Sequence, residues 1–61
     1  MDIRAVFELC KNSFGNDIRY LRQNENGTYE AHEVKQRSLI KYIFDIKDEK
    51  IRILEEKEEK L

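Results

Sequence analysis

The alternation of apolar and polar positions is clearest between residues 39 and 54. On one side of an extended chain every position there is apolar: Ile40, Tyr42, Phe44, Ile46, Ile51 and Ile53. The polar run 47–50 interrupts the alternation midway and predicts a turn. The segment is therefore expected to fold as a β-hairpin.

The expected hairpin matches residue types across its two strands. With the turn at Asp48-Glu49, the predicted pairs are Ile46 with Ile51, Phe44 with Ile53, Ile43 with Leu54, Asp45 with Arg52, and Lys41 with Glu56. Apolar residues face apolar residues and charges face opposite charges, as in stable antiparallel sheets.

A long helix beginning at Ser38 is the alternative for the same segment. Its best heptad seam includes Lys47 and Glu58, and two charges on a seam disfavour it. Strong helix formers at the end of the segment, and the lack of an Asn-Gly or Asp-Gly pair at the turn, favour it. Such a helix would need to dimerise to bury its seam.

Residues 2–14 show helical periodicity. The apolar positions recur three or four residues apart, and they are Ile3, Val6, Phe7, Cys10 and Phe14. Asp2 suits the positive end of a helix dipole. We expect an amphipathic helix that ends before Gly15.

A second hairpin is predicted between Ile18–Gln23 and Thr28–Val34. Residues 24–27, Asn-Glu-Asn-Gly, form the strongest turn motif of the chain, with Gly27 as a left-handed bulge residue. The predicted pairs are Ile18 with Val34, Leu21 with Ala31, Arg19 with Glu33, and Arg22 with Glu30. A short helix at 17–24, ended by Gly27, is the alternative.

These elements predict an α+β fold in which one N-terminal amphipathic helix packs on a small antiparallel sheet of two hairpins. A small all-α protein with a long C-terminal helix is the alternative. We expect residues 1–61 to form a single small domain, since so short a chain has no room for two cores. The segment 55–61 has no apolar stripe, so we expect a solvated charged tail.

Composition excludes several classes of protein. The 61 residues carry a net charge of −1, with eight bases against seven acids in residues 1–47 and four against six in 48–61. This balance suits neither a generic DNA binder nor a DNA mimic. Cys10 is the only cysteine, so a disulfide scaffold is excluded, and a reducing, cytoplasmic location is expected. Neither a signal peptide nor a run of about 20 apolar residues is present.

The residues that could carry chemistry do not form a recognisable site. Cys10 and His32 are 22 positions apart, which matches no zinc motif, and Cys10 is expected to be a buried small hydrophobe. His32 is expected on a half-exposed strand face. Gly15 and Gly27 stand alone, so no glycine-rich phosphate loop exists. We expect no enzyme activity, metal, cofactor or small-molecule substrate.

Two sets of residues are candidates for binding. The first, expected to contact a partner protein, comprises Ile43, Leu54, Arg19, Tyr20, Arg22 and Tyr29. Arginine and tyrosine are common binding anchors, and an apolar pair turned away from the core lacks cover. The second, a candidate nucleic-acid surface, comprises Arg19, Arg22, Lys35, Arg37 and Lys41.

The expected function is that of a small, non-enzymatic regulator or phage-type inhibitor that occupies a partner protein. A nucleic-acid-binding module that uses the Arg/Tyr hairpin is a less favoured alternative, because Glu30 and Glu33 would neutralise its arginines. An assembly subunit, with a homo-oligomer as its product, is the third hypothesis. No membrane partner is expected.

Overall fold

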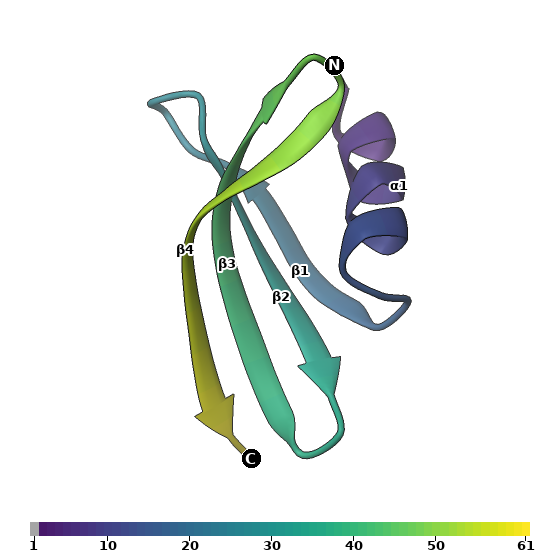
Figure 1. Ribbon diagram of the computed structural model, residues 1–61, viewed down its shortest axis with the longest axis vertical. Helices are drawn as coiled ribbons and strands as arrows, with labels where there is room; N and C mark the ends of the chain where they lie inside the picture. The colour runs from purple at the N-terminus through teal and green to yellow at the C-terminus, as the bar shows by residue number, and fades with distance from the viewer. Residues whose placement is uncertain (1) are drawn as a thin grey trace.

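The computed structural model describes residues 2–61 as one helix and a four-stranded sheet. The elements are α1 (Ile3–Ser13), β1 (Ile18–Gln23), β2 (Tyr29–Lys35), β3 (Ser38–Lys47) and β4 (Lys50–Lys60). The strands form an antiparallel meander in the order β1-β2-β3-β4, with α1 on one face (Figure 1). The α+β prediction is confirmed, and both helical alternatives, at 17–24 and from Ser38, are wrong.

The helix begins and ends with satisfied backbone groups. The Asp2 carboxylate accepts a hydrogen bond from the Ala5 N–H at 3.0 Å, and the Phe14 N–H donates to the Cys10 carbonyl at 2.7 Å. Val6 and Cys10 are fully buried, whereas Ile3 is 48% and Phe7 36% exposed. The sheet therefore covers only the centre of the predicted apolar stripe.

The core lies between α1 and the facing side of the sheet. Its buried apolar residues are Val6, Cys10, Tyr29, Ala31, Ile40, Tyr42 and Phe44. Phe44 is fully buried, with its ring centroid 5.7 Å from that of Phe14 and 5.4 Å from that of Tyr29. Ile53, expected in this core, is 46% exposed, because it lies on the edge strand β4 and no further strand covers it.

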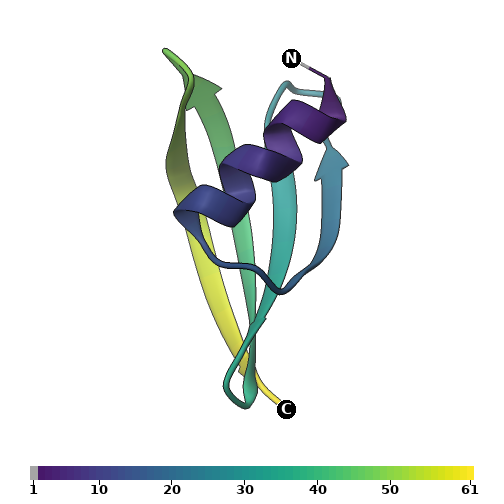
Figure 2. The ribbon, with the colours of Figure 1, turned by 90° about the vertical axis from the view of Figure 1, so that its right-hand side faces the viewer.

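One helix covers only part of the sheet. In Figure 2, α1 crosses in front of one half, and the ends of β3 and β4 near the C-terminus extend well past it. The uncovered part still contains Glu33, whose side chain is only 4% exposed on the α1 side. The Tyr42 hydroxyl donates to its carboxylate at 2.8 Å, so the buried charge has a hydrogen-bond partner.

The first hairpin is close to the prediction. Asn24 and Thr28 flank a three-residue loop, the Asn24 N–H donates to the Thr28 carbonyl at 2.8 Å, and Gly27 has a φ of 87°. The predicted pairs of Leu21 with Ala31 and Arg22 with Glu30 are confirmed.

The start of this hairpin departs from the prediction. A bulge between Ile18 and Tyr20 shifts the register, so Ile18 faces Glu33 instead of Val34. Arg19 therefore does not pair with Glu33. Its Nε lies 2.5 Å from the Asp17 carboxylate.

The second hairpin also keeps its predicted register near the turn and loses it at a bulge. The pairs Ile46 with Ile51, Asp45 with Arg52 and Phe44 with Ile53 are confirmed. Beyond Phe44 the register shifts, so Ile43 faces Glu55 and Lys41 faces Lys57. Leu54 is the extra residue of β4, and the predicted pairs of Ile43 with Leu54 and Lys41 with Glu56 are wrong.

The two predicted hairpins join into one sheet through β2 and β3. Lys35 pairs with Ser38, and Gln36 and Arg37 form a two-residue turn in which Gln36 has a φ of 56°. The segment 55–61, expected to be a solvated tail, continues β4 through Lys60. Its side chains are exposed as expected, but its backbone pairs with β3, which requires no apolar stripe.

Replacement of Phe44 by Ala should lower the free energy of unfolding by about 3–5 kcal/mol, because the ring is fully buried and the cavity cannot collapse onto solvent. Ile53→Ala serves as the matched control on the facing strand and should cost much less, since the side chain is nearly half exposed. Urea denaturation followed by circular dichroism measures both. Equal losses would contradict this position of the core.

Candidate protein-interaction surfaces

Two strands, β1 and β4, form open edges of the sheet. Each pairs with one neighbour, and no described strand lies along its other side. Backbone N–H and C=O groups on an open edge can pair with an added strand. We call these features the β1 edge (Ile18–Gln23) and the β4 edge (Lys50–Lys60).

The β4 edge combines exposed apolar and acidic residues. Ile53 is 46% and Leu54 51% exposed, and they directly precede the bulge in the ladder with β3. After Leu54 the strand carries four glutamates and two lysines. The apolar part of this edge is therefore short and is bordered by negative charge.

The outer face of the sheet, which is the face away from α1, holds most of the predicted partner-binding set. Ile43 lies there, half-buried, in a row with Arg22, Glu30 and Glu55. The Tyr20 ring stacks on His32 with a centroid distance of 4.5 Å. Residues from β1, β3 and β4 thus reach one side of the protein.

The structure separates Tyr29 from the other predicted residues. It is 8% exposed and stacks against Phe44 on the opposite face, so it belongs to the core and cannot contact a partner. The alternation of β2 predicts this: Tyr29 is two positions from Ala31, which is also buried.

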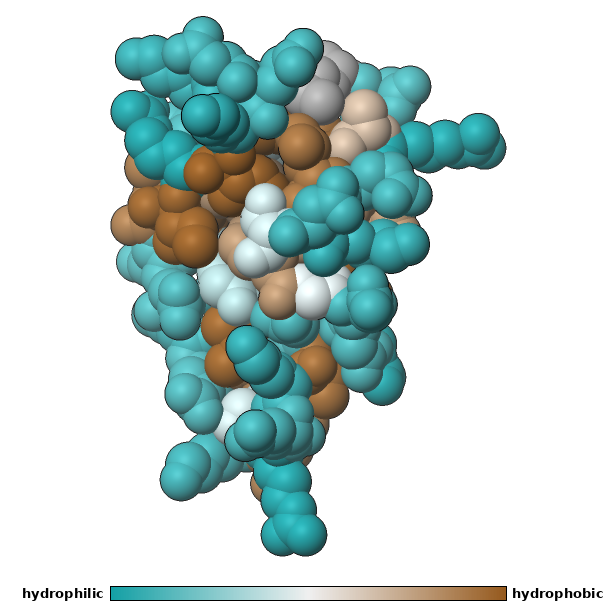
Figure 3. Space-filling model, turned by 45° about the vertical axis from the view of Figure 1, so that its right-hand side comes forward, coloured by the Kyte–Doolittle hydropathy of each residue, from teal (hydrophilic) through white to brown (hydrophobic). Residues whose placement is uncertain are grey.

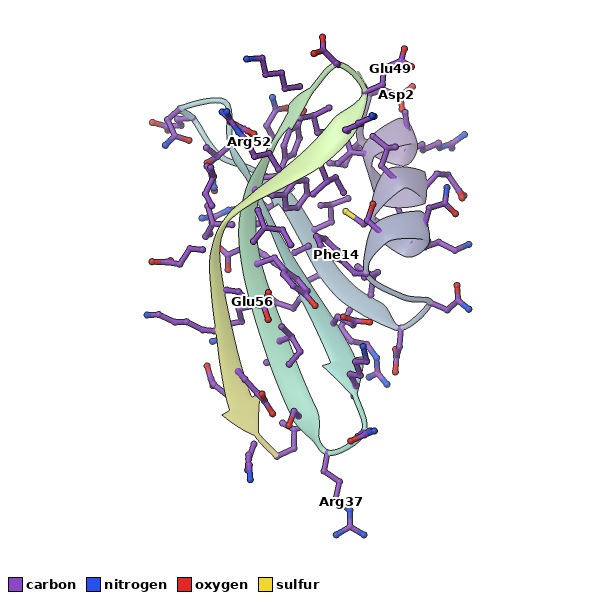
Figure 4. All side chains as sticks on the ribbon, in the orientation of Figure 1. Asp2, Phe14, Arg37, Glu49, Arg52 and Glu56 are labelled. Atoms are coloured by element: carbon purple, nitrogen blue, oxygen red, sulfur yellow. The ribbon has the colours of Figure 1, made fainter. Side chains whose placement is uncertain are left out.

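The predicted nucleic-acid set does not form one basic patch. Arg19 is bound to Asp17, the Lys41 Nζ lies 2.6 Å from Glu59, and Arg22 lies 3.9 Å from Glu30. Glu59 raises the pKa of Lys41 by a hydrogen bond and by its charge. Lys35 and Arg37 lie at the β2–β3 turn, where Arg37 projects from the tip of the protein (Figure 4).

An apolar groove beside the β1 edge was not expected from the sequence. It has a volume of about 360 Å³ and lies between α1 and β1, lined by Ile3, Arg4, Phe7, Glu8 and Leu21. We call it the α1–β1 groove. Helical spacing identified Ile3 and Phe7 as apolar positions, but it could not show that they lie at the margin of the sheet. Figure 3 shows hydrophobic residues gathered on the helix-covered half of the protein, with hydrophilic residues dominating the other half.

A second hollow, of about 510 Å³, lies at the β2–β3 turn beside the end of β4. Its lining is mostly polar and charged: Gln36, Arg37, Ser38, Glu58, Lys60 and Leu61. The Ser38 hydroxyl donates to Glu58 at 2.6 Å, so two of these groups satisfy each other.

The residues considered for chemistry lie apart. Cys10 is buried under α1, whereas His32 lies on the outer face with its Nε2 2.6 Å from Glu30. No group of three or more His, Cys, Asp or Glu residues that could hold a metal ion is found among residues 2–61. Burial raises the pKa of the Cys10 thiol to about 11, which keeps it protonated at neutral pH.

Cys10 should be almost unreactive in the folded protein. At pH 8, a disulfide reagent such as dithionitrobenzoate should modify it far more slowly in buffer than in urea. Because its pKa is higher folded than unfolded, the unfolded thiol ionises first, and the free energy of unfolding should fall as pH rises above about 9. Equal modification rates in the two solvents would contradict the burial of the thiol.

Comparisons with protein-family models, curated proteins and solved structures returned no significant match. Within residues 2–61, α1 is too short and too polar to cross a membrane. The interaction surfaces are therefore assigned on the geometry of this chain alone.

Proposed function

We propose that the protein is a small, non-enzymatic binding module that regulates or inhibits a partner protein by occupying its surface. The observation that carries this proposal is the exposure of Ile53 and Leu54 on the open β4 edge. Large apolar side chains beside unpaired backbone groups favour contact with another polypeptide. Because Cys10 is free and buried, we place this activity in the cytoplasm.

Ile43 extends this surface from the edge onto the outer face. It faces Glu55, the residue after Leu54, so the two apolar side chains lie near the same point of the β3–β4 ladder. Arg22, with its side chain 60% exposed, follows in the same row. A partner that covers Leu54 would meet apolar contact first and charged residues around it, the usual arrangement of a binding surface.

Nucleic-acid binding receives less support than protein binding. Three of the five candidate bases lie within 4 Å of a carboxylate, and the remaining two lie at one turn. A nucleic-acid backbone would have to compete with those carboxylates. We expect no metal, cofactor or small-molecule substrate in this function.

Replacement of Ile43 and Leu54 together by Thr should weaken partner binding tenfold or more, about 1.4 kcal/mol, while sparing the fold. The partner is first identified by affinity capture from the source cell and mass spectrometry. Its dissociation constant is then measured with purified proteins by calorimetry.

The matched control is Leu61→Thr, which removes a side chain that is 75% exposed at the far end of the same strand. It should bind as the wild type does. An unchanged affinity of the double variant would refute the β4 surface and favour the cluster of Arg19, Tyr20 and Arg22.

A further inference from the structure

The two open edges of the sheet carry opposite charge. The β1 edge contains Arg19 and Arg22 and no acid, whereas β4 beyond Leu54 contains four glutamates and two lysines. Two β1 edges would repel each other, and so would two β4 edges. A β1 edge and a β4 edge attract, so the charges select one pairing of the three.

Both edges also direct free backbone groups outward. Asn24 donates to Thr28, and in an antiparallel ladder alternate residues pair with the same neighbour, so Leu21 and Gln23 turn their N–H and C=O groups to the open side. On β4, Lys50 pairs with Lys47 across a two-residue turn, so Ile51 and Ile53 turn theirs outward. Each edge can therefore accept a strand.

Apolar surface lies beside both edges on the α1 side of the sheet. The α1–β1 groove exposes Ile3 and Phe7 next to Leu21, and Ile53 is exposed on β4 opposite the core residue Phe44. If β4 of a second copy lay along β1, its helix-side residues would lie beside the groove. Both exposed apolar surfaces would then be covered by one contact.

The topology allows this contact to repeat. In a four-stranded meander, β1 and β4 are antiparallel, so a second copy in the same orientation continues an antiparallel sheet with its helix on the same side. We propose that the protein associates head to tail, with the β1 edge of one copy paired to the β4 edge of the next. The proposal rests on the function assigned above to the β4 edge, and it names a second copy of this chain as the partner.

Such a contact joins two different surfaces, so it need not stop at a dimer. The wild-type protein should form species whose mass grows with concentration in sedimentation velocity. Raising the salt from low to 1 M should reduce this association, because the paired charges are exposed and screened. A wild type that stays monomeric at every concentration in low salt, or stops at a dimer, would overturn the proposal.

Proline variants can block each edge separately. Gln23→Pro removes an outward N–H from β1, and Ile53→Pro removes one from β4; proline is tolerated on edge strands where the N–H faces solvent. Each variant alone should be monomeric, or at most dimeric through residual contacts. An equimolar mixture should give a one-to-one dimer, because the intact β4 of one variant can pair with the intact β1 of the other. Gln23→Ala is the control and should associate as the wild type does.

Charge variants keep the test valid if a proline variant fails to fold. Arg22→Glu and Glu55→Lys should each weaken association tenfold or more, and the two changes in one chain should restore it. Additive losses in the double variant would overturn the charge pairing. If self-association is absent while Ile43→Thr with Leu54→Thr still abolishes capture of another protein, the proposed function stands and head-to-tail assembly fails.

Discussion

The length of the helix is the constraint on which the rest of the structure depends. Eleven helical residues span about 16 Å, whereas the eleven residues of β4 span about 36 Å when extended. A single helix can therefore cover only part of the sheet. Val6 and Cys10 pack over Phe44 in the covered half, and this contact excludes water from the core.

The boundary of the covered region is organised by polar and aromatic contacts. Phe14 lies between the end of α1 and the sheet (Figure 4), and its ring stacks on Tyr42 with a centroid distance of 3.9 Å. Burial and the Glu33 carboxylate raise the pKa of the Tyr42 hydroxyl, so it remains a hydrogen-bond donor to Glu33 at neutral pH. A side chain at position 15 would collide with this carboxylate, so Gly15 suits the close approach of the α1–β1 connection.

Charged residues stabilise the uncovered half only weakly. Arg52 is bidentate to Asp45 and lowers the pKa of that carboxyl, but the group is exposed, and exposed ion pairs contribute little. The extended ends of β3 and β4 thus depend mainly on their backbone ladder. Pairing of these strands with a further strand would add backbone hydrogen bonds where side-chain packing contributes least.

The sequence predicted the elements well because their periodicities are unambiguous. Alternation through Tyr42 and Phe44 indicated β3, and Gly27 indicated the loop before β2. The bulges at Arg19 and Leu54 could not be predicted, since each inserts one residue without changing the apolar pattern nearby.

The candidate surfaces were predicted less completely than the fold. Exposure of Leu54 was expected and is observed, but Tyr29 was assigned to a surface although its strand position places it in the core. The α1–β1 groove depends on where the helix lies across the sheet, and the residue pattern of α1 alone does not determine this.

The central claim is that the covered half forms the stable core while both sheet edges remain available for pairing. Amide hydrogen exchange by NMR tests it most directly. In dilute protein at high salt, the amide of Phe44 should exchange slowly, and the outward amides of Leu21 and Ile53 should exchange almost as fast as in an unfolded peptide. At high concentration in low salt, these two outward amides should become protected. Strong protection of both in the dilute protein, or no change on concentration, would contradict the account.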